Sequence, residues 1–175
     1  MKKGFEMIGR RICILGPSCS GKSTLSEKLG KKLKYPVLHI DQIAHVPGTK
    51  WIKRPHEEIV KIHDAFIKKQ KWVIDGQYKR LMPQRLKRAD MLILIKTNRF
   101  ICLWNFLNRC CAKHERCGGL KDAPNEFNWP HMWFILYQQP KHRQEQMRII
   151  AAHPHLKVII LRSFKDIDSF VARIS

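Results

Sequence analysis

Residues 16–23 read Gly-Pro-Ser-Cys-Ser-Gly-Lys-Ser and fit the pattern G-x-x-x-x-G-K-[ST] at every fixed position. Glycines let such a loop pass close to a phosphate group, and its backbone N–H groups and the start of the next helix supply a positive field. An apolar run precedes the loop and a helical pattern follows it, as this chemistry requires. We therefore predict a P-loop that binds nucleotide phosphates; a Gly/Ser turn that merely opens a helix is the alternative.

The side chains of this loop suggest ATP and Mg²⁺ as cofactors. We expect Lys22 to reach the β- and γ-phosphates, Ser23 to coordinate Mg²⁺ through its hydroxyl, and Thr24 to lie near the α-phosphate. Cys19 is expected to be a tolerated small residue rather than a nucleophile. The predicted nucleotide-binding residues are Gly16, Ser18, Cys19, Ser20, Gly21, Lys22, Ser23 and Thr24.

Two carboxylates, Asp41 and Asp75, directly follow apolar runs that are typical of strands. Open α/β sheets bind ligands at the carboxyl ends of their strands, so both side chains are candidate functional groups. Phosphoryl transfer needs an acid to hold the water shell of Mg²⁺, and it can use another to orient or deprotonate an acceptor hydroxyl. We assign Asp75 to the metal, through water, and Asp41 to the acceptor. A helix cap or a turn is the alternative for each.

Two arginines, Arg109 and Arg116, are predicted to meet the charge that develops on the transferred phosphoryl group, because guanidinium groups bind oxygens in pairs. They belong to a basic segment, residues 109–126, which contains Gly118 and Gly119 and has the composition of a hinged lid. Such a lid would exclude water during transfer. A solvated, charge-rich helix is the alternative.

The elements that must position these residues alternate along the chain. Five apolar runs are predicted strands, at residues 11–15, 37–40, 72–75, 91–95 and 157–161. Predicted helices cover residues 21–34, 55–70, 79–87, 99–117, 127–152 with possible breaks at Pro130 and Pro140, and 165–174. Continuous apolar runs suit strands that are buried on both faces. The order therefore predicts a doubly wound α/β fold with a parallel sheet.

Length and charge limit the classes of protein that fit. The 175 residues suit one domain, and no apolar run is long enough for a signal peptide or a membrane span, so we expect a cytoplasmic protein without membrane contact. The formal charge of +20 favours anionic partners, nucleic acid among them. The cluster Cys110, Cys111, His114 and Cys117 lacks the spacing of a structural zinc site, and packing is its more ordinary explanation.

The ordered set of motifs resembles adenylate-kinase-like P-loop proteins of the DNA topology modulation family, which is related to flagellar regulators. Beyond the P-loop, the resemblance rests on Leu-His-Ile-Asp at residues 38–41, Pro-Gly at 47–48, Trp51, and Trp-Val-Ile-Asp-Gly-Gln-Tyr at 72–78. Gln77 stands where this pattern has Asn. The resemblance implies a three-layer α-β-α P-loop NTPase fold like that of nucleoside-monophosphate and shikimate kinases, with an acceptor-binding segment at about residues 41–70 and an arginine-bearing lid.

Acceptor contacts are expected from this segment and from the residues after Asp75. The candidates are Trp51, Arg54, His56, Lys79 and Arg80. We expect ATP-dependent phosphoryl transfer to a small acceptor, which would be a nucleotide, a nucleoside or another metabolite. The alternative is a nucleic-acid-associated ATPase or regulator, although the chain has no recognisable nucleic-acid-binding motif.

Overall fold

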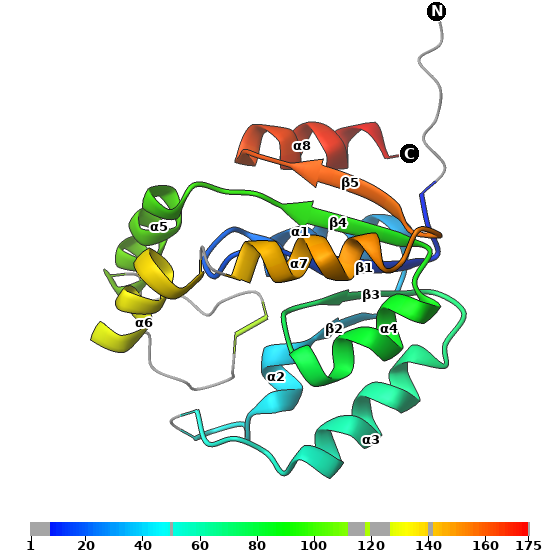
Figure 1. Ribbon diagram of the computed structural model, residues 1–175, viewed down its shortest axis with the longest axis horizontal. Helices are drawn as coiled ribbons and strands as arrows, with labels where there is room; N and C mark the ends of the chain where they lie inside the picture. Colours follow the sequence, from blue (N-terminus) through cyan, green and yellow to red (C-terminus); the bar gives the residue numbers. More distant parts are fainter. Residues whose placement is uncertain (1–7, 50, 112–117, 120–126, 140–141, 175) are drawn as a thin grey trace, which may run out of the picture.

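A single parallel sheet lies at the centre of the computed structural model, which describes residues 8–49, 51–111, 118–119, 127–139 and 142–174 (Figure 1). The strand order is β2-β3-β1-β4-β5. The strands are β1 (Arg11–Leu15), β2 (Val37–His39), β3 (Trp72–Asp75), β4 (Met91–Ile95) and β5 (Lys157–Leu161). The prediction of a five-stranded parallel sheet is confirmed, and four of the five predicted strands have the observed bounds.

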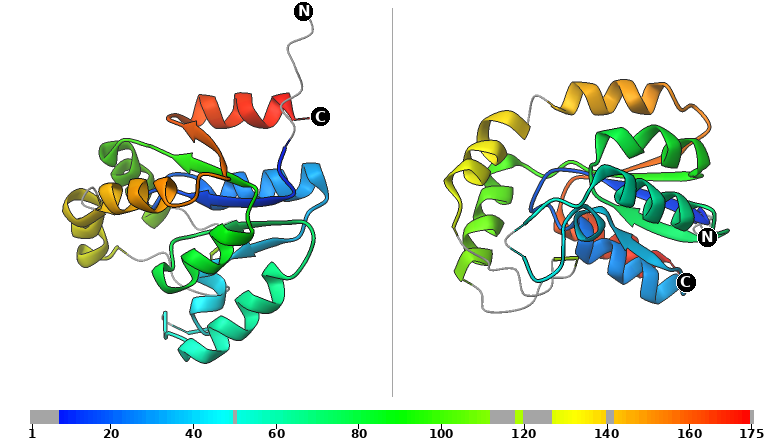
Figure 2. Two further views of the ribbon diagram at one scale, coloured as in Figure 1. Left: turned by 45° about the vertical axis from the view of Figure 1, so that its right-hand side comes forward. Right: turned by 90° about the horizontal axis from the view of Figure 1, so that it is seen from below.

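Alternate residues of the inner strands enter two separate apolar layers, one on each face of the sheet (Figure 2). In β1, Ile12 and Ile14 pack with α1 (Lys22–Leu33) and α8 (Phe164–Arg173). Cys13 and Leu15 pack with α3 (His56–Ile67) and α4 (Met82–Arg88), and α7 (His142–Ala151) adds Ile149 and Ile150 to that layer. This period of two explains why the strands are apolar throughout, since both faces are covered by helices.

A third apolar cluster lies beyond the carboxyl ends of the strands, where α5 (Arg99–Cys111), α6 (Trp129–Trp133) and the π-helical turn η2 (Phe134–Gln138) meet. Its buried members are Cys19, Cys102, Phe106 and Ile135. Because Cys19 belongs to the predicted P-loop, this cluster fixes α5 directly against that loop. No helix among the described residues has the length and apolar character needed to cross a membrane.

Several predicted elements differ from the observed ones. Ile40 is not the last residue of a strand but the first of a short helix, α2 (Ile40–Ala44). The helix predicted over residues 79–87 begins as a 3₁₀ turn, η1 (Lys79–Leu81), before α4. The helix predicted over residues 127–152 is divided into α6, η2 and α7. Pro130 does not break it but lies in the first turn of α6, where a proline ring is tolerated and the side chain of Asn128 accepts a hydrogen bond from the backbone N–H of His131 at 3.1 Å.

Candidate active site

The loop predicted to bind phosphates connects β1 to α1. Gly21 stands at the N-terminus of α1 with φ of 88°, a conformation that L side chains rarely adopt, and a Cβ there would lie 2.9 Å from Cε1 of Phe164. Ser20 Oγ donates to the carbonyl oxygen of Pro17 at 2.8 Å, and Lys22 Nζ donates to the same oxygen. The loop is therefore held together by its own polar side chains.

A cavity of about 240 Å³ opens at this loop and is lined by residues that are far apart in the sequence. Its lining includes these predicted site residues: Ser18, Cys19, Ser20, Gly21, Lys22, Ser23, Thr24, Asp41, Asp75 and Arg109. Trp51, Gly76, Gly118 and Gly119 complete it. Gly16 does not line the cavity, and its carbonyl oxygen instead accepts a hydrogen bond from Nε2 of Gln77 at 3.0 Å.

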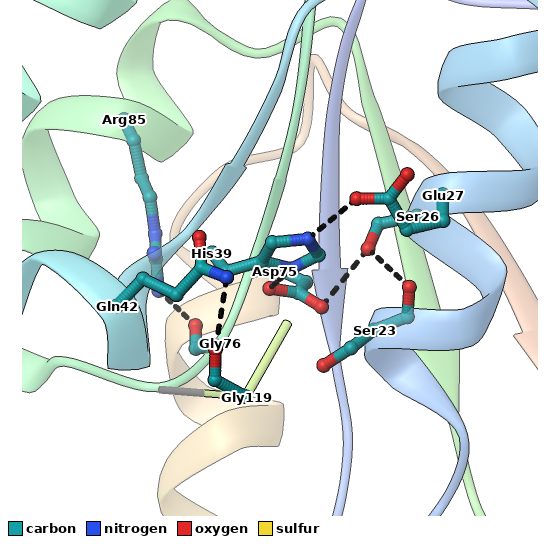
Figure 3. A network of polar contacts seen from close by, with 9 residues as sticks. All are labelled: Ser23, Ser26, Glu27, His39, Gln42, Asp75, Gly76, Arg85 and Gly119. Carbon is teal, nitrogen blue, oxygen red and sulfur yellow. Dashed lines mark hydrogen bonds and ion pairs between the residues drawn. The ribbon is translucent and has the colours of Figure 1, made fainter. Parts of the chain in front are cut away.

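Asp75 ends β3 and is held in a buried polar network (Figure 3). Its Oδ1 lies 2.9 Å from Nδ1 of His39, which ends the neighbouring strand β2, and its Oδ2 accepts from Ser26 Oγ at 3.0 Å. The other ring nitrogen of His39 lies 2.9 Å from Oε1 of Glu27 in α1. Both ring nitrogens thus face carboxylate oxygens, so a protonated imidazole can donate to both.

The pKa shifts of this pair agree in direction. Burial alone would lower the pKa of His39, but hydrogen bonds and charges from Asp75 and Glu27 outweigh it and raise that pKa. Burial would raise the pKa of Asp75, but the hydrogen bond and charge of His39, with the charge of Lys22, outweigh it and lower that pKa. The network therefore holds Asp75 as an anion next to a cationic His39.

Lys22 also lies within the field of the cavity's acidic groups. Burial lowers the pKa of its ammonium group, while the charges of Asp41 and Asp75 act in the opposite direction. A phosphate group at the loop would add further negative charge beside this ammonium. The cavity thus combines one lysine and two carboxylates within a single polar environment.

Asp41 reaches the cavity from a different kind of element than we predicted. It lies in the first turn of α2, not at the end of a strand, and its side chain is exposed. β2 ends at His39, one residue before its predicted end, and the helix begins at Ile40. The turn leaves the carboxylate of Asp41 free to face a second molecule in the cavity, while Asp75 is enclosed.

The predicted lid contributes three described residues to the cavity. Arg109 lines it from the last turn of α5, and that helix is fixed by Asn105, whose Nδ2 donates to the carbonyl oxygen of Cys19 at 2.9 Å. Gly118 has φ of +68°, and a Cβ there would lie 2.8 Å from Ser23 Oγ. Gly119 accepts at its carbonyl oxygen from Gln42 Nε2 at 3.0 Å. Arg116 lies outside the described residues.

The candidate acceptor contacts divide into two groups. Trp51 lines the cavity and meets the ring of His45 edge-on at 5.2 Å between centroids. Arg54 instead donates to backbone carbonyl oxygens, including that of Ile43 at 3.2 Å, and His56 lies 3.3 Å from the hydroxyl of Tyr78. Lys79 and Arg80 are exposed and do not line the cavity. Of these candidates, Trp51 alone is positioned to touch a ligand there.

Three polar contacts in and around the site have little or no signal in the sequence. The His39–Glu27 pair had a signal only in the histidine of the Leu-His-Ile-Asp motif. Arg85, fully buried, donates to the carbonyl oxygen of Gly76 at 2.6 Å, although its sequence surroundings suggest a surface arginine. Gln139, from the end of η2, accepts at Oε1 from the backbone N–H of Ser18 at 2.6 Å, and no local sequence pattern indicates this contact.

Among the described residues, no three His, Cys, Asp or Glu side chains are grouped to hold a metal ion. Cys110 and Cys111 lie at the end of α5, whereas His114 and Cys117 lie outside the described part of the chain.

Comparison with known proteins identifies the fold class of the chain. No protein-family model and no curated protein matches the chain. Solved structures do match along most of it. A shikimate kinase from Bacteroides thetaiotaomicron is 18% identical with a TM-score of 0.56, and the match covers 95% of this chain and 97% of that one. A gluconokinase from Sinorhizobium meliloti 1021 is 13% identical with a TM-score of 0.54, and the match covers 93% of this chain and 87% of that one. A shikimate kinase from Aquifex aeolicus is 15% identical with a TM-score of 0.51, and the match covers 94% of this chain and 95% of that one. The chain therefore has the α/β fold of P-loop kinases, while membership of the DNA topology modulation family stays a prediction.

Proposed function

We propose that this protein is a kinase that transfers a phosphoryl group from ATP to a small acceptor, with Mg²⁺ as its metal. The observation that carries the proposal is the cavity, which brings Lys22, Asp41, Asp75 and Arg109 together at the P-loop. Phosphoryl transfer depends on positioning and on stabilising charge, and these side chains are of the types that do both. The fold shared with shikimate kinase and gluconokinase structures is consistent with this chemistry.

The donor set fits Mg²⁺ and triphosphate. Ser23 and Asp75 both line the cavity and would hold the ion, Ser23 through its hydroxyl and Asp75 through water. Bound Mg²⁺ would neutralise charge on the phosphate oxygens. His39 keeps Asp75 ionised, and Ser26 orients its second carboxylate oxygen. Lys22 and Arg109, which both line the cavity, would supply positive charge to the γ-phosphoryl group.

The acceptor would lie on the side of the cavity formed by Asp41 and Trp51. Asp41 is exposed, and a carboxylate can accept the proton of an acceptor hydroxyl. The indole of Trp51, which lines the same cavity, offers an apolar surface for the rest of the acceptor. Gly76, which follows Asp75 in the chain, also lines the cavity. A hydroxyl-bearing small molecule is therefore the class of acceptor that this part of the cavity favours.

ADP release with Mg²⁺, measured against a panel of acceptors, tests the proposal. The panel should hold gluconate and shikimate, which the names of the similar structures suggest, together with nucleosides, nucleotides and DNA. Two variants are compared with the wild type, Lys22→Ala for the phosphate contact and Asp41→Asn for the acceptor contact. Lys79→Ala is the matched control, because it removes an exposed lysine that does not line the cavity.

Acceptor-dependent ADP release by the wild type and by Lys79→Ala, with loss of about a hundredfold or more in Lys22→Ala, would support the proposal. Asp41→Asn should lose transfer and keep ATP binding. Turnover that Lys22→Ala leaves unchanged would contradict the P-loop assignment. ADP release stimulated by DNA alone would replace the kinase with a nucleic-acid-linked ATPase.

A further inference from the structure

A second cavity, of about 480 Å³, lies beside the P-loop at the carboxyl end of β4. It is formed by the P-loop, the segment that follows Asp75, the end of β4 and the start of α5, the residue after β5, the residue after η2, and the middle of α7. Its lining is Pro17, Gln77, Leu94, Ile95, Lys96, Thr97, Asn98, Arg99, Ile101, Gln139, Gln146, Met147 and Arg162. None of these residues lines the candidate active site.

The charges and surfaces of this second cavity select a class of ligand. Lys96, Arg99 and Arg162 line it, and no Asp or Glu is among the lining residues whose side chains the structure describes. The side chains of Ile101 and Met147 add an apolar surface of the kind that accommodates a hydrocarbon or ring. An organic anion matches both properties, with its charged group at the cations and its body on the apolar side chains.

Two lining residues join the second cavity to the P-loop. Gln139 accepts at Oε1 from the backbone N–H of Ser18 at 2.6 Å, and Gln77 donates to the carbonyl oxygen of Gly16 at 3.0 Å. Ser18 also lines the candidate active site. Gln139 thus holds the backbone of a P-loop residue in the same conformation that forms the second cavity.

We propose that this second cavity is an inhibitory effector site for a small organic anion, a carboxylate or phosphate ester with an apolar body. A ligand that fills the cavity as it stands stabilises the conformation in which Gln139 holds Ser18, and so opposes the binding of nucleotide phosphate. The coupling is reciprocal, so bound nucleotide weakens binding of the anion. Anion binding itself does not depend on the proposed kinase activity, although its coupling to nucleotide rests on the proposed nucleotide site.

The test is NMR of the full chain with labelled methionine methyl groups. The probes are hydrocinnamate for the carboxylate class and phenyl phosphate for the phosphate class. Met147 reports on the cavity, Met91 in the buried sheet is the internal reference, and Met147→Leu assigns the signal. Lys96→Gln removes one cation of the site, and Lys157→Gln is its matched control, because Lys157 is an exposed lysine at the opposite end of the neighbouring strand.

The expected result is a saturable shift of the Met147 signal with a fixed Met91 signal, for at least one of the two probes. Affinity should fall about tenfold in Lys96→Gln, since a charged hydrogen bond is lost, and stay unchanged in Lys157→Gln. Saturating Mg·ADP should weaken probe binding in the wild type and have no effect in Gln139→Ala. A Met147 signal that neither probe moves, or equal weakening in both lysine variants, would overturn the effector site.

Two further outcomes separate this inference from the proposed function. Probe binding that Mg·ADP does not alter, in a protein shown by calorimetry to bind Mg·ADP, would overturn the inhibitory coupling alone. Saturable probe binding in a protein that binds no Mg·ADP would overturn the coupling and the proposed kinase together, and it would leave the anion site established.

Discussion

At the scale of single residues, the arrangement around Asp75 separates the two carboxylates of the cavity by environment. Asp75 is enclosed and paired with His39, whereas Asp41 is exposed in the first turn of α2. A paired anion is suited to hold a metal's water shell without changing its protonation. An open carboxylate is better placed to exchange a proton with a bound molecule. The difference supports the separate roles that we propose for them.

The pairing of His39 predicts a dependence of stability on pH. Its pKa is raised above the ordinary value of 6.5 by Asp75 and Glu27, which outweigh burial. The ion pair therefore contributes stability that is complete below that value and is lost as pH rises through the folded-state pKa. We expect His39→Gln to lower the free energy of unfolding most in mildly acidic solution and least in alkaline solution.

Urea unfolding of the wild type and His39→Gln across this pH range measures the effect. His153→Gln is the matched control, because the His153 ring hydrogen-bonds to the backbone carbonyl oxygen of Ile149 and forms no ion pair with a carboxylate among the described residues. A difference between wild type and His39→Gln that is the same at every pH would mean that the imidazole acts as a neutral hydrogen-bonding group.

At the scale of elements, α8 gives the clearest case of local sequence determining a boundary. Ser163 accepts from the backbone N–H of Asp166 at 3.1 Å, and Asp166 accepts in return from the backbone N–H of Ser163 at 3.1 Å. This reciprocal capping box satisfies donors that a helix start leaves unpaired. The helix then packs Ile167 and Phe170 into the layer that it shares with α1.

Replacing Ser163 by Ala should lower the free energy of unfolding by about 1 kcal/mol, because the N-terminus of α8 loses its cap. Thermal and urea denaturation both measure this loss. Lys165→Ala, an exposed change in the first turn of the same helix, is the control and should alter stability much less. Equal losses in the two variants would show that the capping box contributes nothing beyond local helix propensity.

The elements also show what the sequence could and could not predict. The inner strands β1, β3 and β4 were predictable because they are buried on both faces and so are almost entirely apolar. The cavity's P-loop residues were predictable because one contiguous motif carries them. The contacts of His39 with Glu27 and of Gln139 with Ser18 join different segments of the chain. Neither the spacing of apolar residues nor a sequence motif predicts such contacts. The five-residue helix α2 is too short to show a helical period, so Ile40 was assigned to the strand before it.

At the scale of the whole molecule, the dominant property is the charge of +20. Like charges repel across the folded surface, and dissolved ions screen that repulsion. The described ion pairs that involve acidic partners, such as Lys28 with Asp168, offset only a few of the cations. Charge repulsion should therefore act against the compact state in dilute buffer.

We expect the melting temperature to rise between about 0.02 M and about 0.3 M NaCl, because the Debye length shortens over that range. Differential scanning calorimetry measures the change, and an isosmotic series in sucrose controls for effects that do not depend on charge. A melting temperature that stays flat in NaCl, or rises equally in sucrose, would show that repulsion does not limit stability.

The cluster in which Cys19 packs on Cys102, Phe106 and Ile135 has one further consequence, for chemical reactivity. Cys19 is 6% exposed although it borders the active-site cavity, whereas Cys111 lies on the outer surface of α5. An alkylating reagent will reach Cys111 at once, and it will reach Cys19 only during fluctuations that move α5 away from the loop. The alkylation rate of Cys19 therefore records how often α5 separates from the P-loop, and a nucleotide that holds the two together would slow it.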